Sequence, residues 1–293
     1  VNELVIDPSD RFTLYLGSIA NGLFYSYDAA EGWMRPRENY LREGRVRAVA
    51  VDANDKCTLY VSRGQKLAKS TDCGRTFDTE TYVDPRADVV ITDVEVDWFN
   101  GNTIYVVNTV GEVLKSTDAG ATWTTVYSKG GFARDIEVSN ADSRILLLGT
   151  AKKGIHRSGD AGATWTEVLD KDADAYKNLD GVENVQNLVQ TKAGDALWAS
   201  TEYGLIRSAD TGQTWSAVPL ITPPSGVGIT ALAVDPRDGN HVMYVAGSTV
   251  YATLNGGARW ETEQMPVNAR AFQLIIDPEQ SQTVYMGLRS IEE

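Results

Sequence analysis

The sequence predicts an all-β fold of short antiparallel strands, and three observations predict it. A motif of eight residues recurs along the chain, apolar strands flank the copies, and turn-forming residues occur about every 8–12 residues. Glycine (26 residues), tyrosine (13) and tryptophan (7) are frequent among the 293 residues, as expected where tight turns join short strands. The length suffices for one large domain or two small ones.

The recurring motif reads Ser-x-Asp-x-Gly-x-x-Trp, with Phe77 as the aromatic residue of one copy. Four copies follow it, at residues 70–77, 116–123, 158–165 and 208–215. Two copies are degraded: residues 253–260 begin with Thr, and residues 26–33 have Ala30 where Gly belongs. The acidic position is held by Asp28, Asp72, Asp118, Asp160, Asp210 and Asn255. The steps of 44, 46, 42, 50 and 45 residues between them match the length of one propeller blade.

The context of each copy predicts a blade of four strands. A first apolar strand ends in Asp, as at residues 49–52, and a second follows a polar turn, as at residues 58–62. A third strand enters the motif and the aromatic residue opens the fourth. The sequence thus predicts a seven-bladed β-propeller of four-stranded antiparallel blades, a single domain over residues 1–293. The blades are expected at about 1–40, 41–86, 87–128, 129–175, 176–222 and 223–266, with an incomplete last blade at 267–293 that residues outside this sequence or a partner would complete.

The residue types of the motif indicate a structural role. The motif is the hairpin turn between the third and fourth strands, and its Asp or Asn side chain accepts hydrogen bonds from turn N–H groups. Gly supplies a positive φ, and Trp or Phe buries a large apolar area between neighbouring sheets.

On these residues the chain resembles the Asp-box, or BNR-type, β-propellers. This group includes sialidases, two-propeller xyloglucanases, the sortilin ectodomain and photosystem II assembly factors. The resemblance covers nearly the whole chain and implies the fold, whereas the functions within the group differ widely.

Composition excludes several classes of function. The net charge of −13 disfavours binding to nucleic acid or anionic lipid, and no apolar run approaches the roughly 20 residues of a membrane span. The chain begins at Val1 without Met or a signal peptide pattern, so we interpret it as a processed mature chain or an excised domain. Cys57 and Cys73 lie in the first and third turns of one blade, at the same end, and we expect a disulfide. An oxidising compartment would follow, so we expect a secreted, periplasmic or cell-surface protein.

A search for an active site finds little. The Arg-Ile-Pro motif of sialidases is absent, and His156 and His241 lie far apart without a nucleophile nearby. The chain is about half as long as a two-propeller xyloglucanase, and of the seven tryptophans only Trp98 is left free for sugar stacking. No catalytic residue is assigned.

Carboxylates are expected to gather on the channel side of two adjacent inner strands. Because Val94 and Ile136 point to the core, the alternating residues face the channel: Asp93, Glu95, Asp135 and Glu137. The cluster has three interpretations: a solvated channel with salt bridges to Arg47 and Arg134, a metal or ligand site, or a general acid/base pair.

A second acidic segment resembles the start of a calcium loop. It contains Asp170, Asp172 and Asp174, but Ala175 and Gly181 stand where the EF-hand pattern requires Gly and Glu. A solvated acidic loop is the alternative interpretation, and no metal or other cofactor is assigned.

The connection between the first two blades is rich in arginine. It contains Arg35, Arg37, Arg42, Arg45 and Arg47, offset only by Glu38 and Glu43. Arginine suits bidentate capture of carboxylates and is enriched at interfaces, and photosystem assembly factors resemble this chain in carrying an arginine patch. We therefore expect a partner-binding face that includes these residues and Arg134, with a solvated loop of local ion pairs as the alternative.

These observations favour a non-catalytic, extracytoplasmic protein-binding scaffold, such as a subunit or assembly factor of a larger complex. The alternative function is a glycoside hydrolase or carbohydrate-binding propeller.

Overall fold

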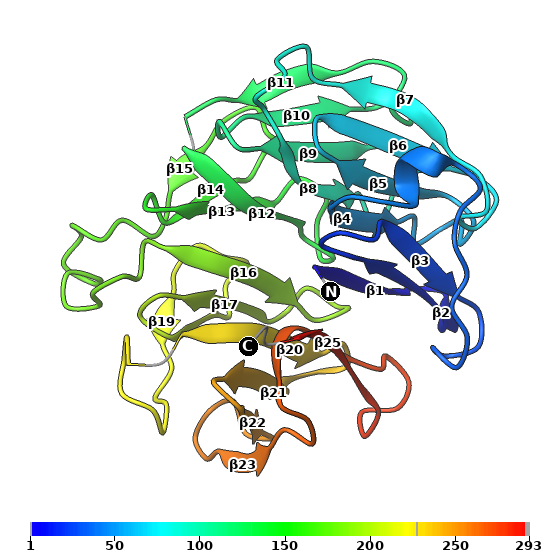
Figure 1. Cartoon of the computed structure of the whole chain (residues 1–293). Helices are drawn as coiled ribbons and strands as arrows, with labels where there is room; N and C mark the ends of the chain where they lie inside the picture. The colour runs from blue at the N-terminus through cyan, green and yellow to red at the C-terminus, as the bar shows by residue number, and fades with distance from the viewer. Residues whose placement is uncertain (1, 130, 227, 291–293) are drawn as a thin grey trace. The chain divides into compact units, whose positions relative to one another are not determined.

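The computed structural model describes residues 2–129, 131–226 and 228–290, and these form an all-β fold (Figure 1). The chain divides into two compact units, Val1–Val138 (unit 1) and Ser139–Glu293 (unit 2). Among the described residues no helix is long and apolar enough to cross a membrane, and the single 3-10 helix is η1 (Asn39–Leu41).

Every sheet is an antiparallel meander of strands that follow one another in the chain. Unit 1 contains β1 (Glu3–Asp7), β2 (Asp10–Gly17), β3 (Leu23–Ser26), β4 (Val46–Val51), β5 (Leu59–Arg63), β6 (Lys66–Ser70), β7 (Asp78–Val83), β8 (Ile91–Val96), β9 (Ile104–Asn108), β10 (Val113–Ser116), β11 (Thr124–Tyr127) and β12 (Phe132–Val138). Unit 2 contains β13 (Leu146–Ala151), β14 (Ile155–Ser158), β15 (Thr166–Glu167), β16 (Val185–Gln190), β17 (Leu197–Thr201), β18 (Leu205–Ser208), β19 (Ser216–Ala217), β20 (Ile229–Asp235), β21 (Asp238–Ala246), β22 (Thr249–Thr253), β23 (Glu261–Gln264), β24 (Ala269–Ile276) and β25 (Val284–Ser290).

The fold has six blades, so the prediction of seven is wrong. Five sheets have four strands: β4–β7, β8–β11, β12–β15, β16–β19 and β20–β23. The first sheet, β1–β3, has its fourth strand reduced to the bridge between Tyr25 and Met34. Each of these six sheets contains one copy of the motif, whereas β24 and β25 pair only with each other. An apolar run in the sequence predicted a seventh blade, but a blade needs the motif turn that joins a third strand to a fourth, and residues 269–290 form no such turn.

The motif folds as the expected hairpin turn, shown here for residues 116–123. Ser116 Oγ donates to Asp118 Oδ1 (2.8 Å) and accepts from the Gly120 N–H (2.9 Å). The second Asp118 interaction is with Thr122, whose N–H and Oγ1 donate to the carboxylate at 2.8 and 2.6 Å. Ala119 (φ 58°) and Gly120 (φ 93°) are both left-handed. The side chains thus satisfy the polar groups of the turn, which fixes its shape.

Glycine at the fifth motif position also allows neighbouring sheets to approach. A Cβ on Gly120 would lie 2.6 Å from Thr81 Cγ2 in the preceding sheet, and one on Gly212 would lie 2.5 Å from Leu147 Cδ2. The indole of Trp123 packs against Tyr82, with ring centroids 5.3 Å apart, and donates to the Gly120 carbonyl (2.9 Å). The motif turns of Gly120 and Gly212 are therefore contacts between sheets as well as local hairpins.

The largest buried side chains occupy one position of the second strands. Tyr15, Tyr60, Tyr105, Trp198 and Tyr244 are all fully buried there. Aromatic residues at this position bury a large area and fill the space between successive sheets.

Candidate functional site

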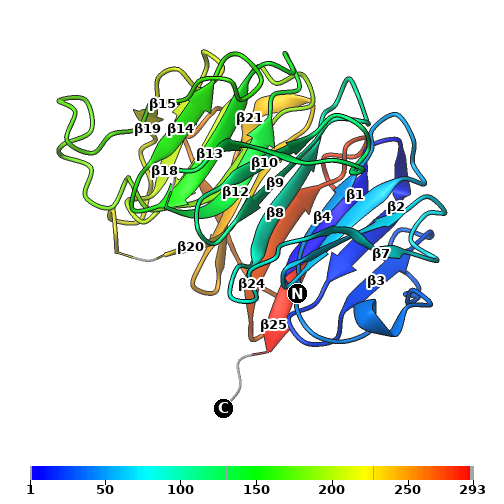
Figure 2. The ribbon, with the colours of Figure 1, turned by 90° about the horizontal axis from the view of Figure 1, so that it is seen from above.

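Two neighbouring inner strands of unit 1, β8 and β12, carry the four predicted carboxylates. Strands β1, β4, β8 and β12 lie next to one another in this order (Figure 2). On β8, Val94 and Val96 are buried in the core, so Asp93 and Glu95 point to the opposite side of the strand and are half-buried. Asp135 and Glu137 on β12 alternate with buried residues in the same way.

Sequence analysis missed one further carboxylate beside these strands, Glu3 on β1. Electrostatic coupling joins Glu3 to Asp135, Asp93 and Glu95, so the four form a carboxylate cluster. A signal for Glu3 was present, because it precedes the strand-final Asp7 by four residues, as Asp93 precedes Asp97.

Burial and mutual repulsion raise the pKa values within the carboxylate cluster. Burial, and then the charge of Asp135, raise the pKa of Glu3 to about 8 and that of Glu95 to about 8. The same two causes raise the pKa of Asp93, although its carboxylate accepts the Ile136 N–H at 3.0 Å. A pKa raised in this way is what a general acid requires.

The two arginines expected beside the cluster lie on the same strands. Arg47 on β4 and Arg134 on β12 are both half-buried, and burial together with Arg45 lowers the pKa of Arg47. Within the described part of the chain, no three His, Cys, Asp or Glu side chains are grouped as metal ligands.

The predicted acidic loop at 170–174 is a surface turn. The Asp172 N–H donates to Asp170 Oδ1 (2.9 Å), and Asp174 is almost fully exposed and pairs with Lys177 (2.9 Å). Two of its three acidic side chains are thus used in local contacts.

The arginine connection (residues 35–47) brings together only part of its predicted residues. The Arg35 guanidinium lies over the Phe24 ring, with 4.9 Å from Cζ to the centroid, and donates to the carbonyls of Asn21 (2.7 Å) and Arg42. Arg45 donates through Nε and Nη2 to Asn2 Oδ1 (3.1 and 2.7 Å). These contacts hold Arg35 and Arg42 near the turn at 18–22 and Arg45 beside Asn2.

Arg37 lies apart from this group. Its backbone N–H donates to the Arg75 carbonyl (3.0 Å), which belongs to the motif turn at the other end of the second blade. The path of the connection therefore separates residues that are close in sequence.

None of the five arginines of the connection forms an ion pair with a carboxylate of the described residues, Glu38 and Glu43 included. Arg35, Arg37, Arg42 and Arg45 are exposed. The local ion pairs of the alternative interpretation are thus not formed among the residues that the structure describes. In a chain with a net charge of −13, this surface is positive and available to an acidic partner.

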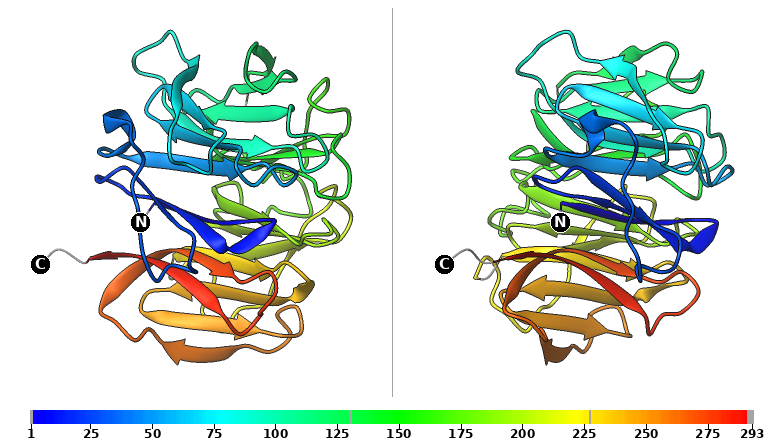
Figure 3. Two further views of the ribbon diagram at one scale, coloured as in Figure 1. Left: turned by 90° about the vertical axis from the view of Figure 1, so that its right-hand side faces the viewer. Right: turned by 45° about the vertical axis from the view of Figure 1, so that its right-hand side comes forward.

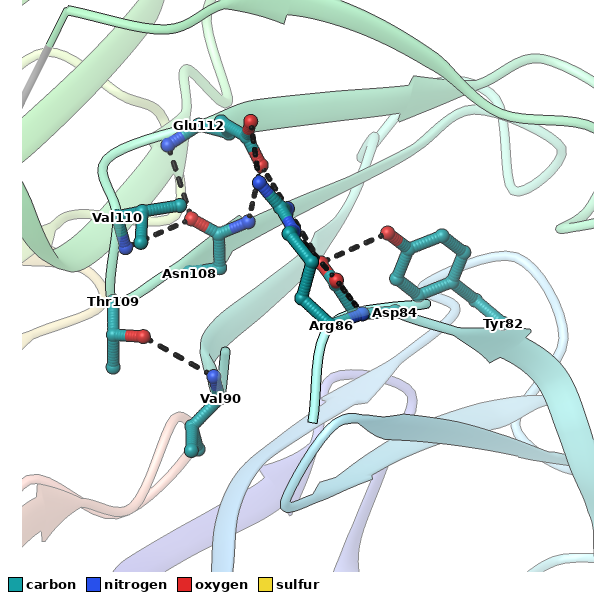
Figure 4. A network of polar contacts seen from close by, with 8 residues as sticks. All are labelled: Tyr82, Asp84, Arg86, Val90, Asn108, Thr109, Val110 and Glu112. Atoms are coloured by element: carbon teal, nitrogen blue, oxygen red, sulfur yellow. Dashed lines mark hydrogen bonds and ion pairs between the residues drawn. The ribbon is translucent and has the colours of Figure 1, made fainter. Parts of the chain in front are cut away.

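Arg86, in the next connection, shows the opposite arrangement (Figure 4). Its guanidinium pairs with buried Asp84 (2.8 Å) and with Glu112 (2.5 Å), and Asn108 Nδ2 also donates to Glu112 (2.9 Å). The pairing lowers the pKa values of Asp84 and Glu112 and raises that of Arg86. This arginine serves to hold the connection to the turn at 109–112.

Apolar side chains are exposed at the same strand ends as the arginine connection. Ile19, Val110 and Phe132 are each 44–45% exposed, and all lie between second and third strands or where a blade begins. The turn at 18–22 is tied to the connection by the Gly22 N–H to Gly44 carbonyl bond (2.9 Å). This end of unit 1 thus combines exposed guanidinium groups, which form no ion pair with a described carboxylate, with apolar side chains, a combination typical of interfaces.

A disulfide joins Cys57 and Cys73, as expected from the position of their turns. The Cys73 N–H also donates to the Cys57 carbonyl (3.0 Å), and the Cys73 carbonyl accepts the Tyr27 hydroxyl from the first blade (2.7 Å).

Comparison with known proteins gives one relative by sequence. No protein-family model matches the chain. A xyloglucanase of Paenibacillus sp. is 25% identical over 349 aligned positions, which cover 90% of this chain and 34% of the relative. The chain therefore spans about a third of the length of the relative it matches.

Solved structures of two kinds resemble the fold. The GH74 xyloglucanase of Xanthomonas campestris (TM-score 0.79, 16% identity) and a GH74 enzyme of Niastella koreensis (TM-score 0.75, 18% identity) are matched over 99% and 98% of this chain and 50% of theirs. A structure of YCF48 bound to D1 peptide (TM-score 0.73, 15% identity) is matched over 98% of this chain and 92% of its own. At these identities the likeness concerns the fold alone, and it confirms that the chain is a β-propeller.

Proposed function

We propose that this chain is a protein-binding scaffold whose binding face is the arginine connection with the apolar tips beside it. The observation that carries the proposal is the set of exposed guanidinium groups without a carboxylate partner among the described residues. Exposed arginines that remain unpaired in an acidic chain supply donors for a partner's carboxylates. Ile19, Val110 and Phe132 would contact apolar side chains of the same partner.

Two further points support this proposal. YCF48 has the same fold as this chain over most of its length, and its structure is bound to a peptide. The motif turns fit the Asp-box pattern. If all six motif turns serve to hold the fold together, the connections between blades remain available for binding a partner. The Cys57–Cys73 disulfide supports a location outside the cytoplasm, such as the periplasm, the cell surface or the extracellular medium.

The test is a quantitative pull-down from extracellular and periplasmic extracts with two charge-reversal variants. Arg35→Glu with Arg42→Glu changes the proposed face, and Arg259→Glu changes an exposed arginine in unit 2 as the control. We expect proteins that the wild type and R259E retain equally to be lost from R35E/R42E, with circular dichroism unchanged. A set of bound proteins that is the same for all three chains would refute the proposal.

Glycoside hydrolysis is the second candidate, and two observations favour it. The xyloglucanase relative aligns with 90% of this chain, and Glu3 and Glu95 have pKa values raised to about 8, which suits a general acid. Release of reducing sugar from xyloglucan at pH 5–8, abolished in Glu95→Gln and retained in R35E/R42E, would establish this function in place of the first. Absence of release by the wild type would exclude this second candidate, and the pull-down would then decide on the first.

A further inference from the structure

The disulfide of unit 1 joins two turns at one end of the second blade. Cys57 lies between β4 and β5, and Cys73 is the fourth residue of the motif at 70–77. The third blade joins the same two turns by a backbone hydrogen bond from the Ala119 N–H to the Asn102 carbonyl (2.9 Å). It has no disulfide, since the chain contains only two cysteines. The disulfide is therefore added to a contact that another blade makes without it.

The second blade also differs from its neighbours in the aromatic residue of the motif. Trp123 and Trp165, in the third and fourth blades, each donate the indole N–H to the carbonyl of their own motif glycine (2.9 and 3.1 Å). Phe77 stands at this position in the second blade and has no such donor. The disulfide thus ties together a motif turn that lacks one hydrogen bond of its neighbours.

The same motif turn supports the start of the arginine connection, which is the blue segment with the short coil of η1 in Figure 3. The Arg75 carbonyl accepts the Arg37 N–H (3.0 Å), and the Cys73 carbonyl accepts the Tyr27 hydroxyl (2.7 Å). The Arg75 guanidinium also lies over the Tyr27 ring, with 5.2 Å from Cζ to the centroid. Because the first sheet has only three strands, these contacts hold the chain where it leaves that sheet.

We propose that the Cys57–Cys73 disulfide is a redox switch for the arginine connection, opened by a dithiol reductant. One thiolate of the reductant attacks a sulfur of the disulfide and forms a mixed disulfide, and the second thiol then displaces the protein sulfur. The reductant ends as a disulfide, and both cysteines end as thiols. Both cysteines are partly exposed, so the reductant has access to them.

The switch acts through residues 73–75. Without the disulfide this turn retains its own hydrogen bonds, but it opens more often by local unfolding. Each opening breaks the contacts with Arg37 and Tyr27 and releases the start of the connection. Control of partner binding by this switch rests on the proposed function, whereas the order of the connection can be measured with no partner present.

The test is hydrogen–deuterium exchange of the oxidised protein and of the protein reduced with dithiothreitol, both without denaturant. We expect the amides of residues 37–44 to exchange about tenfold faster or more after reduction, because local opening becomes more frequent. The motif turn at 116–123 is the internal control and should keep its exchange rates. The double variant Cys57→Ser with Cys73→Ser should exchange as the reduced protein does and should not respond to dithiothreitol.

Tyr27→Phe provides a second measurement in the oxidised protein, because it removes one contact with the turn and keeps the disulfide. It should also speed the exchange of residues 37–44, by less than reduction does. Unchanged exchange of these residues in Y27F or after reduction, or an equal increase at 116–123, would overturn the switch whatever the pull-down gives. Faster exchange confined to the connection would establish the switch even if R35E/R42E retained the same proteins as the wild type, a result that would refute only the scaffold.

Discussion

Replacing Glu95 by Gln tests whether the carboxylate cluster of unit 1 makes the stability of the protein depend on pH. The folded state raises the pKa of Glu95 from its usual 4.5 to about 8, through burial and the neighbouring charges of Asp135 and Glu3. The folded protein thus binds more protons than the unfolded chain between these two values. Its stability is greatest below pH 4.5 with respect to this group and falls as the pH rises through 8.

The magnitude follows from the difference of about 3.5 between the two pKa values. Fully realised, this difference corresponds to about 5 kcal/mol. Because Glu95 is only half-buried, solvent screens the repulsion, and we expect about 1–2 kcal/mol in practice. Glu95→Gln keeps the shape of the side chain and removes the charge, so it should stabilise the protein by this amount at pH 9 and by almost nothing at pH 4.5.

The assay is urea unfolding at pH 4.5, 7 and 9, followed by tryptophan fluorescence. Glu263→Gln, which changes an exposed residue of β23, is the control and should give the same change at every pH. A difference between E95Q and the wild type that does not vary with pH, or that becomes less favourable to E95Q as the pH rises, would refute the reasoning.

Three further predictions concern the motif turns and the disulfide. Ser116→Ala should lower the free energy of unfolding by about 1–3 kcal/mol, because the buried Ser116 hydroxyl forms hydrogen bonds with both Asp118 and the Gly120 N–H. Ser116→Thr keeps the hydroxyl, as Thr253 does in the last motif, and should lower it much less in the same urea assay. Ala30→Gly should stabilise by about 0.5–1 kcal/mol, because Ala30 has a φ of 71°, and an unchanged or lower urea midpoint would contradict this. Replacing Cys57 and Cys73 together by Ser should lower the free energy of unfolding by about 3 kcal/mol for a closed loop of this size. Dithiothreitol should lower the urea midpoint of the wild type and leave that of the double variant unchanged.

The repeat allowed most of the local structure to be predicted, because the motif satisfies its own polar groups. Ser116, Asp118 and Thr122 bond one another whatever surrounds them, so a sequence match is enough to predict the turn. The number of blades could not be predicted in this way. The strand at 269–276 has the apolar pattern of an inner strand, but whether further strands join it depends on residues that make no motif turn.

The composition of the functional surface was harder to predict than the turns. Five arginines within 13 residues suggested one patch, but Arg37 is drawn to the carbonyl of Arg75 in a turn far along the chain. Glu3 was missed because the search began from two strands, although the spacing from Asp7 marks it as equivalent to Asp93. The position of Arg37 and the place of Glu3 in the carboxylate cluster both depend on contacts between segments that are distant in sequence. Such contacts cannot be read from a single sequence.

Charged side chains have different roles in the motif turns and in the arginine connection, and this difference favours the connection as the binding surface. Hydrogen bonds within the turn lower the pKa values of Asp28, Asp72, Asp118, Asp160 and Asp210, so these carboxylates stay charged but have their oxygens occupied. A ligand at that end would have to break the turn that holds two sheets together. At the opposite end of unit 1, exposed Arg42 donates no side-chain hydrogen bond to the described residues, so a binding function can change there while the fold is kept.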